Sequence, residues 1–304
     1  MSKINRLFQI LGHPKELMLE LMKRTATYWP DKIYIKTQYR LILGKSLDLE
    51  KPKTLSEKLN WSKLYYHNPD IHSLVEKYEV KKIVSDKIGS EYVIPTLAIW
   101  DTIDDIYISQ LPNQFVLKCT HDSGSVIICK DKATFDFEHA KKLLRRSYKR
   151  QYYYSAREWA YKDIKPRIIC EPFIPTLGKK ESVEYKITVY NGKVRFVTVC
   201  TGIAHTDLSK RTNDHFTPNW ERLPFYAYYK PSGQEIPKPS FMDKMIELTE
   251  KLADGLPQVR VDWYYNEGKM IFGEMTFYTW AGYLLFNSEE WDEKLGSWLN
   301  LPTK

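Results

Sequence analysis

Two stretches of the chain alternate hydrophobic and polar residues with the period of a β-strand, and a turn signal interrupts each of them. The stretch 259–282 contains two runs rich in aromatic and β-branched residues, which flank Asn266-Glu267-Gly268. The stretch 183–199 is divided by Asn191-Gly192, the strongest short-range turn signal. Both patterns predict antiparallel hairpins.

Two further strands are predicted at 115–119 and 126–129, on either side of the polar loop His121–Ser125. Lys118 lies near the end of the first strand, and a lysine in that position needs an anion. A loop of small residues exposes backbone N–H groups that can hold a phosphate. The segment therefore predicts a phosphate-binding element.

Other segments have the spacing of amphipathic helices. They include residues 1–40, where Pro14 stands at the expected start of a second helix, and the segments 131–166 and 240–254. Thr54-x-x-Glu57 has the form of a capping box and predicts the start of another helix.

The length of the loop in the last hairpin decides which side chains share a face of the sheet. A three-residue loop that ends in a left-handed Gly268 pairs Asp262 with Phe272 and places the two acids diagonally, about 7–8 Å apart. The residues that then share one face are Arg260, Asp262, Glu274 and Thr276. A two-residue loop would place the acids on opposite faces, because a slip of one residue inverts a strand.

Two carboxylates and an arginine on one sheet face are costly to bury without a partner. Mg²⁺ with a polyphosphate meets this need, because Asp262 and Glu274 can hold the metal while Arg260 contacts a phosphoryl oxygen. A solvated hairpin with exposed charges is the alternative that this segment alone leaves open.

This arrangement resembles the metal-binding end of ATP-grasp enzymes, which form carboxylate–amine bonds through an acyl phosphate. The resemblance implies Arg260 as a catalytic residue and Asp262, Glu274 and Thr276 as metal ligands. The family usually has Glu-x-Asn where this chain has Glu274-Met275-Thr276, and a threonine hydroxyl is a weaker ligand.

The segment that begins at Thr54-x-x-Glu57 and continues through Trp61 resembles the TupA-like branch of this family. That branch is associated with the synthesis of teichuronopeptide and capsular polysaccharide. The segment 88–100 continues the resemblance, and Glu184-Tyr185-Lys186 matches an Asp-Tyr-Lys element of the branch.

The resemblance also implies a nucleotide site. Lys118 and the loop after it resemble the first ATP lysine and the phosphate-covering loop, although His121 could instead bond within the loop. The strand predicted at 167–175 resembles the hinge that reads adenine, with an acid at its exit for the ribose hydroxyls. The implied nucleotide contacts are Lys118, His121, Ser123, Gly124, Ser125, Glu171, Pro172, Phe173, Glu184 and Lys186. The resemblance implies that Lys186 faces a phosphate or the acyl acceptor, which makes it the second implied catalytic residue, and a solvated strand edge is the open alternative.

Residues 200–239 are polar and contain several prolines and aromatic residues. We expect a long irregular excursion, which in a compact enzyme is usually functional. It would cover the acceptor pocket, with His205, Asp207 and Arg211 as polar candidates, although an ordered surface loop is the open alternative.

The composition is that of a globular protein with an excess of positive charge. The 304 residues carry a net charge of +8, which suits anionic partners. The four cysteines form no CxxC pair, so neither a zinc site nor a disulfide framework is expected. No signal peptide or membrane-spanning stretch is evident, which predicts a cytoplasmic protein. No nucleic-acid module is recognisable, and the basic N-terminal segment could lie on the inner membrane surface or pack on the protein.

Taken in order, these segments imply an α+β protein with the ATP-grasp fold, in which two α+β lobes grip ATP. The expected division is an N-terminal helical segment at 1–88, a lobe with the phosphate-covering loop at 89–170, and a lobe with the metal site at 171–304. The resemblance implies a carboxylate–amine ligase that uses ATP and Mg²⁺. Neither GxxxxGK[ST] nor GxGxxG is present, which argues against P-loop and Rossmann chemistry.

By the same resemblance, the substrates are an acidic sugar or polysaccharide precursor and an amine or amino acid. Three alternatives stay open. A sugar kinase would transfer phosphate to a hydroxyl. A glycosyltransferase would be expected to carry a donor-site Asp-x-Asp, which this chain lacks. A binding module without catalysis is also compatible with Thr276 at the second metal position.

Overall fold

The computed structural model describes residues 14–175, 177 and 182–303, so the part of the expected N-terminal helices before Pro14 lies outside it. The α-helices are α2 (Pro14–Arg24), α3 (Asp31–Leu43), α4 (Leu55–Tyr65), α5 (Asp70–Val75), α6 (Glu79–Ile88), α7 (Phe137–Tyr148), α8 (Tyr153–Ala156), α9 (Met242–Leu252) and α10 (Glu289–Ser297). The strands are β1 (Ala98–Trp100), β2 (Phe115–Cys119), β3 (Val126–Cys129), β4 (Ile168–Pro172), β5 (Glu184–Tyr190), β6 (Lys193–Thr201), β7 (Thr212–Phe216), β8 (Arg222–Leu223), β9 (Gln258–Asn266) and β10 (Lys269–Thr276).

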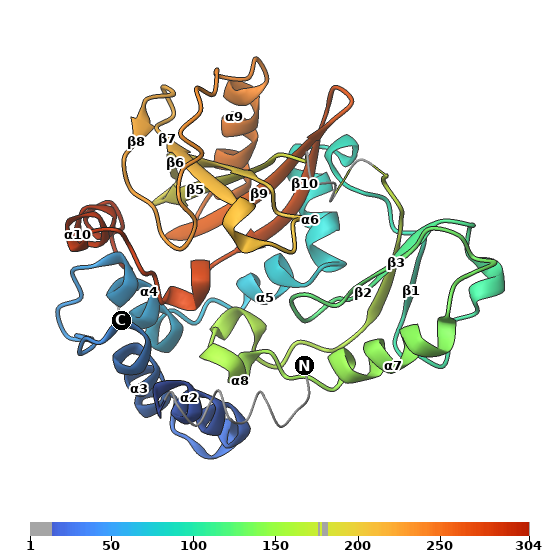
Figure 1. The fold of residues 1–304 in the computed structure, drawn as a ribbon, viewed down its shortest axis with the longest axis horizontal. Helices are drawn as coiled ribbons and strands as arrows, with labels where there is room; N and C mark the ends of the chain where they lie inside the picture. The colour runs from blue at the N-terminus through green and yellow to red at the C-terminus, as the bar shows by residue number, and fades with distance from the viewer. Residues whose placement is uncertain (1–13, 176, 178–181, 304) are drawn as a thin grey trace.

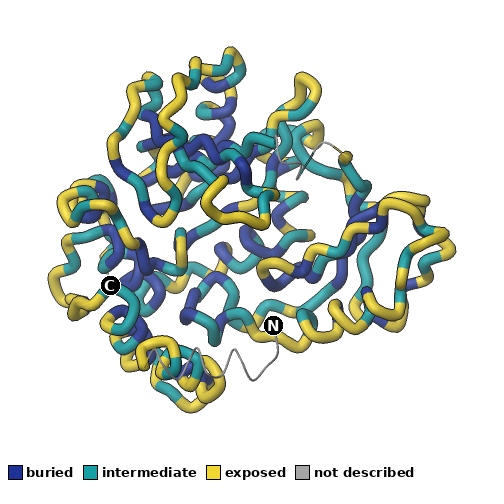
Figure 2. The backbone as a smooth tube through the Cα atoms, viewed as in Figure 1, coloured by how far each residue is buried: buried dark blue, intermediate teal, exposed yellow. Residues whose placement is uncertain are grey.

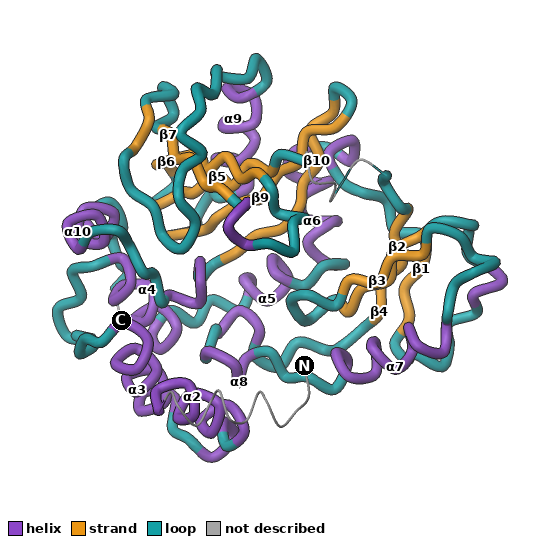
Figure 3. The backbone as a smooth tube through the Cα atoms, in the orientation of Figure 1, coloured by secondary structure: helices purple, strands orange, loops and turns teal. Residues whose placement is uncertain are grey.

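The strands form two antiparallel sheets (Figure 1). The four-stranded sheet has the order β1-β4-β2-β3, and the six-stranded sheet has the order β10-β9-β5-β6-β7-β8. Helices α5 and α6 lie between the two sheets, while α2, α3 and α4 gather at the end of the molecule away from the four-stranded sheet (Figure 3). The predicted α+β class is confirmed.

Several elements follow directly from local sequence. The capping box is present, because Thr54 Oγ1 accepts a hydrogen bond from the Glu57 amide at 3.1 Å and Glu57 Oε2 accepts one from the Thr54 amide at 3.1 Å. The strands predicted at 115–119 and 126–129 are β2 and β3. The Asn191-Gly192 hairpin is also confirmed, with both residues at positive φ.

The six-stranded sheet separates a hydrophobic core from a polar face. Tyr185, Ile187 and Val189 of β5 are buried in one cluster with Met245 and Leu248 of α9. The intervening residues of β5 face the other side, since side chains alternate along a strand. Figure 2 shows buried segments in this sheet and in α9, and others in the four-stranded sheet and the N-terminal helices.

The register of the last hairpin differs from the prediction. The turn has two residues, Glu267 and Gly268, both at positive φ, so Lys269 pairs with Asn266 rather than with Tyr265. The ladder then shifts between Phe272 and Glu274, where Gly273 forms a β-bulge.

A two-residue turn without a bulge would place Asp262 and Glu274 on opposite faces of the sheet, and the bulge brings them back to the same face. Phe272 pairs with Trp263, and Glu274 pairs directly with Asp262. The two acids therefore share a face as cross-strand neighbours, although the predicted pairing of Asp262 with Phe272 is wrong. A Cβ at Gly273 would lie 2.9 Å from the Asp262 carbonyl oxygen, which explains why glycine occupies the bulge.

The excursion expected at 200–239 is only partly irregular. Thr212–Phe216 forms β7, which pairs with β6 and extends the sheet, and Arg222–Leu223 forms β8. Asp214 is fully buried and accepts hydrogen bonds from the Arg222 guanidinium and the Ser232 amide, so it is an internal partner rather than a loop residue. Asp207, by contrast, is exposed and accepts hydrogen bonds from Ser209 in its own turn.

A strained turn, η6 (Thr279–Gly282), follows β10. Trp280 (φ 51°, ψ 34°) and Ala281 (φ 52°, ψ 28°) are consecutive left-handed residues, each costing roughly 1–2 kcal/mol. Helix α4 holds the turn, because Lys63 Nζ donates to the Ala281 carbonyl at 2.5 Å and Asn60 Nδ2 donates to the Gly282 carbonyl at 2.7 Å.

Candidate functional site

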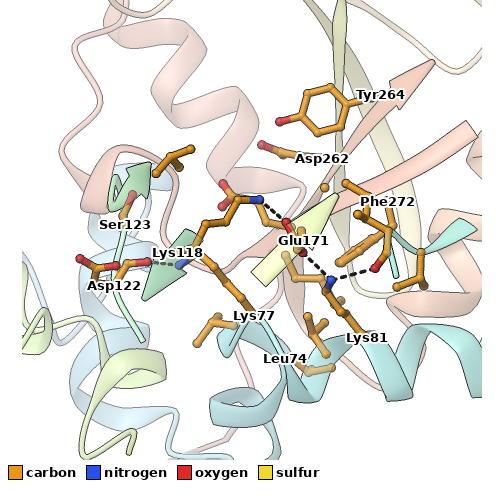
Figure 4. Close-up of a pocket in the computed structure, with 18 of the residues that line it drawn as sticks. Leu74, Lys77, Lys81, Lys118, Asp122, Ser123, Glu171, Asp262, Tyr264 and Phe272 are labelled. Carbon is orange, nitrogen blue, oxygen red and sulfur yellow. Dashed lines mark hydrogen bonds and ion pairs between the residues drawn. The ribbon is translucent and has the colours of Figure 1, made fainter. Parts of the chain in front are cut away.

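A cavity of about 240 Å³ lies between the polar faces of the two sheets. Lys118 and Glu171 come from the four-stranded sheet, and Asp262 and Glu274 come from the six-stranded sheet. Helices α5 and α6 close one side, and Figure 4 shows side chains from both sheets and the α5–α6 segment converging on the cavity. The site is therefore built from segments that are far apart in the sequence.

The carboxylate of Glu171 pairs with two lysines. Lys118 Nζ lies 2.5 Å from Glu171 Oε2, and Lys81 Nζ pairs with Oε1 and also donates to the Ile94 carbonyl at 2.8 Å (Figure 4). Burial alone would raise the pKa of Glu171, but the two ammonium groups outweigh burial and lower it. Burial lowers the pKa of Lys81. These cations form the part of the cavity that can bind phosphate oxygens.

The loop after β2 lies beside these lysines. Ser123 and Gly124 line the cavity, with Gly124 at a φ of 91° that favours glycine. Ser125 Oγ donates to Asp122 Oδ1 at 2.5 Å and accepts from the Cys119 amide, which ties the loop to its strand. Lys77 Nζ donates to the Asp122 carbonyl, and burial lowers the pKa of this lysine.

Asp262 is the centre of the charged cluster on the six-stranded sheet. Arg260 donates to both of its oxygens, from Nε at 2.6 Å and from Nη2 at 2.8 Å, and Lys186 Nζ lies 2.7 Å from Oδ2. Arg260 Nη2 also reaches Glu274 Oε1 at 3.4 Å and Thr276 Oγ1 at 3.1 Å. All the residues expected on this face are therefore in one hydrogen-bonded group.

The carboxylate of Asp262 and the neighbouring cations stabilise each other's charged forms. Burial opposes ionisation of Asp262, but Arg260 and Lys186 outweigh it and hold the pKa of the carboxyl below its usual range. Burial likewise opposes the charge of Lys186, and Asp262 outweighs it, so the pKa of Lys186 is raised. The carboxylate and both cations are charged at neutral pH.

The acids fit a metal ion that arrives with phosphate groups. Mg²⁺ in nucleotide sites takes one or two carboxylates together with phosphate oxygens. Asp262 and Glu274 supply two carboxylates on paired strands, and the Thr276 hydroxyl lies 3.3 Å from Glu274 Oε1. Within the ranges that the structure describes, no group of three or more His, Cys, Asp or Glu side chains could hold a metal alone.

Four expected nucleotide contacts do not line this cavity. His121 is buried, and its Nε2 lies 3.1 Å from the Arg150 carbonyl oxygen, facing a different cavity. Ser125 is occupied by bonds within the loop. Pro172 pairs with Phe115, and neither it nor Phe173 is among the residues that form the cavity wall. Apolar walls come instead from residues such as Val80, Val93, Ile94, Phe272 and Met275.

Lys77 and Lys81 line the cavity but were not among the residues predicted from the sequence. Both precede the strands of the site, on or next to the charged helix α6. Lysines at helical spacing look the same whether they face solvent or a cavity, so the sequence carries no signal for them. Only the packing of α6 against both sheets reveals their position.

In the part of the chain that the structure covers, every helix is too short or too polar to cross a membrane. A search of curated proteins found no match to this sequence.

Solved ligases of low sequence identity are similar in structure. The D-alanine–D-alanine ligase of Bacillus anthracis, solved with ATP, is 13% identical with a TM-score of 0.38, over 67% of this chain and 55% of that chain. D-cycloserine synthetase DcsG is 15% identical with a TM-score of 0.39, over 68% and 62% of the two chains. The ATP-grasp ligase PsnB, solved with a minimal precursor, Mg and ADP, is 10% identical with a TM-score of 0.39, over 85% and 66%. The chain thus spans less than two thirds of the length of the first two ligases.

A sequence model described as TupA-like ATPgrasp matches residues 57–300. The match begins in α4 and includes both sheets and the candidate site. It confirms the resemblance inferred from the capping-box segment and the last hairpin. The chain belongs to the TupA-like ATP-grasp family.

Proposed function

We propose that this protein is an ATP- and Mg²⁺-dependent carboxylate–amine ligase that acts through an acyl phosphate. One observation carries the proposal: Asp262 and Glu274 face the same cavity as Lys81 and Lys118, across the gap between the two sheets. Such a cavity can hold a metal at one end and phosphate oxygens at the other. A ligase of this family needs both.

In this proposal the cationic residues bind the phosphate groups, and the acidic residues bind Mg²⁺ and the ribose. Lys81, Lys118 and the backbone of Ser123–Gly124 bind the phosphates of ATP and orient the γ-phosphoryl group toward the six-stranded sheet. Arg260 and Lys186 neutralise the charge that develops on the transferring group. Asp262 and Glu274 hold Mg²⁺, which when bound neutralises phosphate charge. Glu171 accepts the ribose hydroxyls at the edge of the cavity.

The reaction has two steps. A carboxylate oxygen of the first substrate attacks the γ-phosphorus, the bond to the β-γ bridging oxygen breaks, and ADP leaves. The nitrogen of a neutral amine then attacks the acyl carbon, inorganic phosphate leaves, and the amine loses a proton. The products are an amide, ADP and phosphate. By family analogy, the carboxylate belongs to an acidic sugar or polysaccharide precursor. We propose the cytoplasm as the place of this reaction.

The test is to measure ADP release by the purified full chain with Mg²⁺ and combinations of amines and uronic-acid glycans. The ligase proposal expects ADP release that requires both an amine and a carboxylate. ADP release with a sugar alone would instead identify a kinase. Release of UDP from a nucleotide sugar without ATP would identify a glycosyltransferase, and absence of Mg²⁺-dependent ATP binding would identify a binding module without ATP chemistry.

Lys118→Met tests the phosphate side of the site. We expect it to weaken nucleotide binding by more than about tenfold, because a charge-assisted contact is worth about 1.5–3 kcal/mol. Lys130→Met is the matched control, since Lys130 is exposed at the end of the neighbouring strand. Equal nucleotide affinity in the two variants would contradict the assignment of Lys118.

A further inference from the structure

A polar row crosses the six-stranded sheet and leads out of the candidate nucleotide site. Glu274 pairs with Asp262, Asp262 with Lys186, Lys186 with Thr198, and Thr198 with His215. These five residues are successive cross-strand neighbours, so their side chains lie on one face of the sheet. The row ends in a second cavity of about 70 Å³, which shares Lys186 with the first.

The second cavity is cationic at one end and apolar at the other. Lys186 and Arg260 line the end next to the candidate metal ligands. The apolar part is lined by Leu55, Tyr190, Phe225, Leu284, Phe286 and Leu295. A ligand for this cavity has an anionic group beside a small apolar group.

Polar groups without a protein partner are placed to receive such a ligand. The hydrogen bonds of Arg260 to its three neighbours use Nε and Nη2, which leaves Nη1 for a ligand. His215 lines the cavity, Thr198 Oγ1 occupies its Nδ1 at 2.9 Å, and its buried Nε2 has no partner.

The strained turn η6 supplies one wall. Trp280 lines the cavity, is 43% exposed, and packs against Tyr228 with the rings tilted by 32° and their centroids 4.2 Å apart. Its left-handed backbone is held by hydrogen bonds from α4 to the two following residues. Strain that the surrounding structure maintains in this way is characteristic of ligand sites.

We propose that this second cavity binds the amine substrate of the ligase, and that this substrate is an α-amino acid with a small apolar side chain. The inference rests on the proposed function. The α-carboxylate pairs with Arg260 Nη1, and the side chain fills the apolar end. Lys186 and Arg260 next to the amine favour its neutral form, which is the form that attacks the acyl phosphate.

The volume of the cavity limits the side chain. A dry cavity of about 150 Å³ admits benzene, so one of about 70 Å³ suits about three non-hydrogen atoms, which is the size of the side chain alone. The α-carboxylate and the amine then lie at the mouth of this cavity, beside Lys186, which also lines the first cavity. A valine-sized group fits, whereas a benzyl group or a hexose ring does not. The acidic sugar therefore binds elsewhere and supplies the carboxylate.

The test is calorimetric titration of amino acids into the full chain saturated with Mg²⁺ and a non-hydrolysable ATP analogue. The series is glycine, alanine, 2-aminobutyrate, valine, leucine and phenylalanine, with glutamate and lysine as charged members. We expect the tightest binding for 2-aminobutyrate or valine, with glycine and phenylalanine weaker by more than about tenfold.

Phe286→Ala should enlarge the cavity and move the preference toward leucine and phenylalanine. Phe241→Ala is the matched control, because Phe241 is also half-buried but stacks on Tyr265, away from the cavity. Saturable binding of no amino acid, a preference for glutamate or lysine, or the same preference in Phe286→Ala as in the wild type would overturn the inference.

The two proposals can fail separately. If the chain binds no Mg²⁺–ATP analogue, the ligase proposal fails, and amino-acid binding measured without nucleotide still reports on the cavity. If nucleotide binds and an amine-dependent release of ADP occurs with a different class of amine, only the amino-acid inference fails.

Discussion

The carboxylate of Asp262 receives hydrogen bonds from Arg260 and Lys186, while Glu274, its cross-strand neighbour, keeps a side chain that is 54% exposed. The two acids lie on one face and yet differ in what their removal should cost. Asp262 compensates two cations in a site where it is itself only 4% exposed. Glu274 makes one long contact to Arg260.

Asp262→Asn should therefore lose both stability and activity. Removing one partner of a buried ion pair costs about 3–5 kcal/mol, because the remaining cations stay buried without compensation. Glu274→Gln should change the free energy of unfolding by no more than about 0.5 kcal/mol, as is usual for exposed positions, and still abolish Mg²⁺-dependent ADP release. Urea denaturation and an ADP assay on both variants check this. A fully active Glu274→Gln variant would remove Glu274 from the metal site.

His215 provides a pH-dependent contribution to stability. Burial lowers the pKa of His215 to about 3, against an ordinary value of 6.5. Between these two values the unfolded chain binds a proton that the folded chain does not, so stability is full above pH 6.5 and is lost as the pH falls toward 3. The slope approaches about 1.4 kcal/mol per pH unit.

His215→Gln should flatten this part of the stability profile. Thermal or urea unfolding between pH 6.5 and the acid range, compared with the wild type, isolates the contribution of this residue from that of the carboxylates. His139→Gln is the control, because His139 is exposed on α7. Parallel pH profiles for His215→Gln and the wild type would contradict the buried neutral histidine.

At the scale of elements, strands and caps could be predicted from the sequence because their determinants are local. β2 and β3 are short, mostly apolar runs on either side of a polar loop, and Thr54 and Glu57 form reciprocal hydrogen bonds within one helical turn. β7 was missed because its sequence, Thr-Asn-Asp-His-Phe, is polar, and Asp214 and His215 are buried only through partners outside the strand.

The register of the last hairpin could not be predicted in the same way. The residues that share a face were expected correctly, but through a three-residue turn without a bulge. In the structure, a two-residue turn and the bulge at Gly273 together place these residues on one face. Both combinations of turn and bulge are compatible with the pattern of hydrophobic and polar residues in the sequence. Only the pairing with the partner strand in the structure distinguishes them.

Two changes at Gly273 test whether the bulge itself is needed or only the pairing of Glu274 with Asp262. Gly273→Val should destabilise the protein by about 1–3 kcal/mol and reduce Mg²⁺-dependent nucleotide binding, because its Cβ would meet the Asp262 carbonyl oxygen at 2.9 Å and the Tyr264 ring at 3.0 Å. Deleting Gly273 should be tolerated better. Phe272 would still pair with Trp263, and Glu274 with Asp262, in a plain ladder.

Chemical denaturation and titration with an Mg²⁺–ATP analogue compare the two variants. If the deletion abolishes nucleotide binding while Gly273→Val retains it, the bulge does more than keep the two acids opposite each other.

At the scale of the whole molecule, the candidate site depends on parts of the chain that were expected to be separate. The helical segment expected at 1–88 contributes Lys77 and Lys81 to the cavity, beside Lys118 from the unit expected at 89–170 and Glu171 from the unit expected at 171–304. Val80 and Val84 of the same segment belong to the hydrophobic cluster of the six-stranded sheet. These contacts predict that the segment cannot be removed.

A chain that starts at residue 89 should therefore show neither a cooperative unfolding transition nor nucleotide binding. The full-length double variant Lys77→Met/Lys81→Met is the comparison: it should unfold cooperatively but bind nucleotide more weakly. Circular dichroism during urea titration and binding of a fluorescent ATP analogue measure both properties. A shortened chain that folds and binds nucleotide would establish that the helices are an independent appendage.

The hydrogen bonds from Lys63 and Asn60 to the turn at Trp280 have a consequence for chimeric proteins within the family. Because α4 holds the backbone that presents this tryptophan, exchanging the N-terminal helices between two relatives would reshape the wall of the second cavity. Selectivity could then change in a chimera whose two sheets are identical to those of its parent. The evolution of substrate choice in such enzymes can thus be sought in α4, a helix with no residue on the wall of the first cavity.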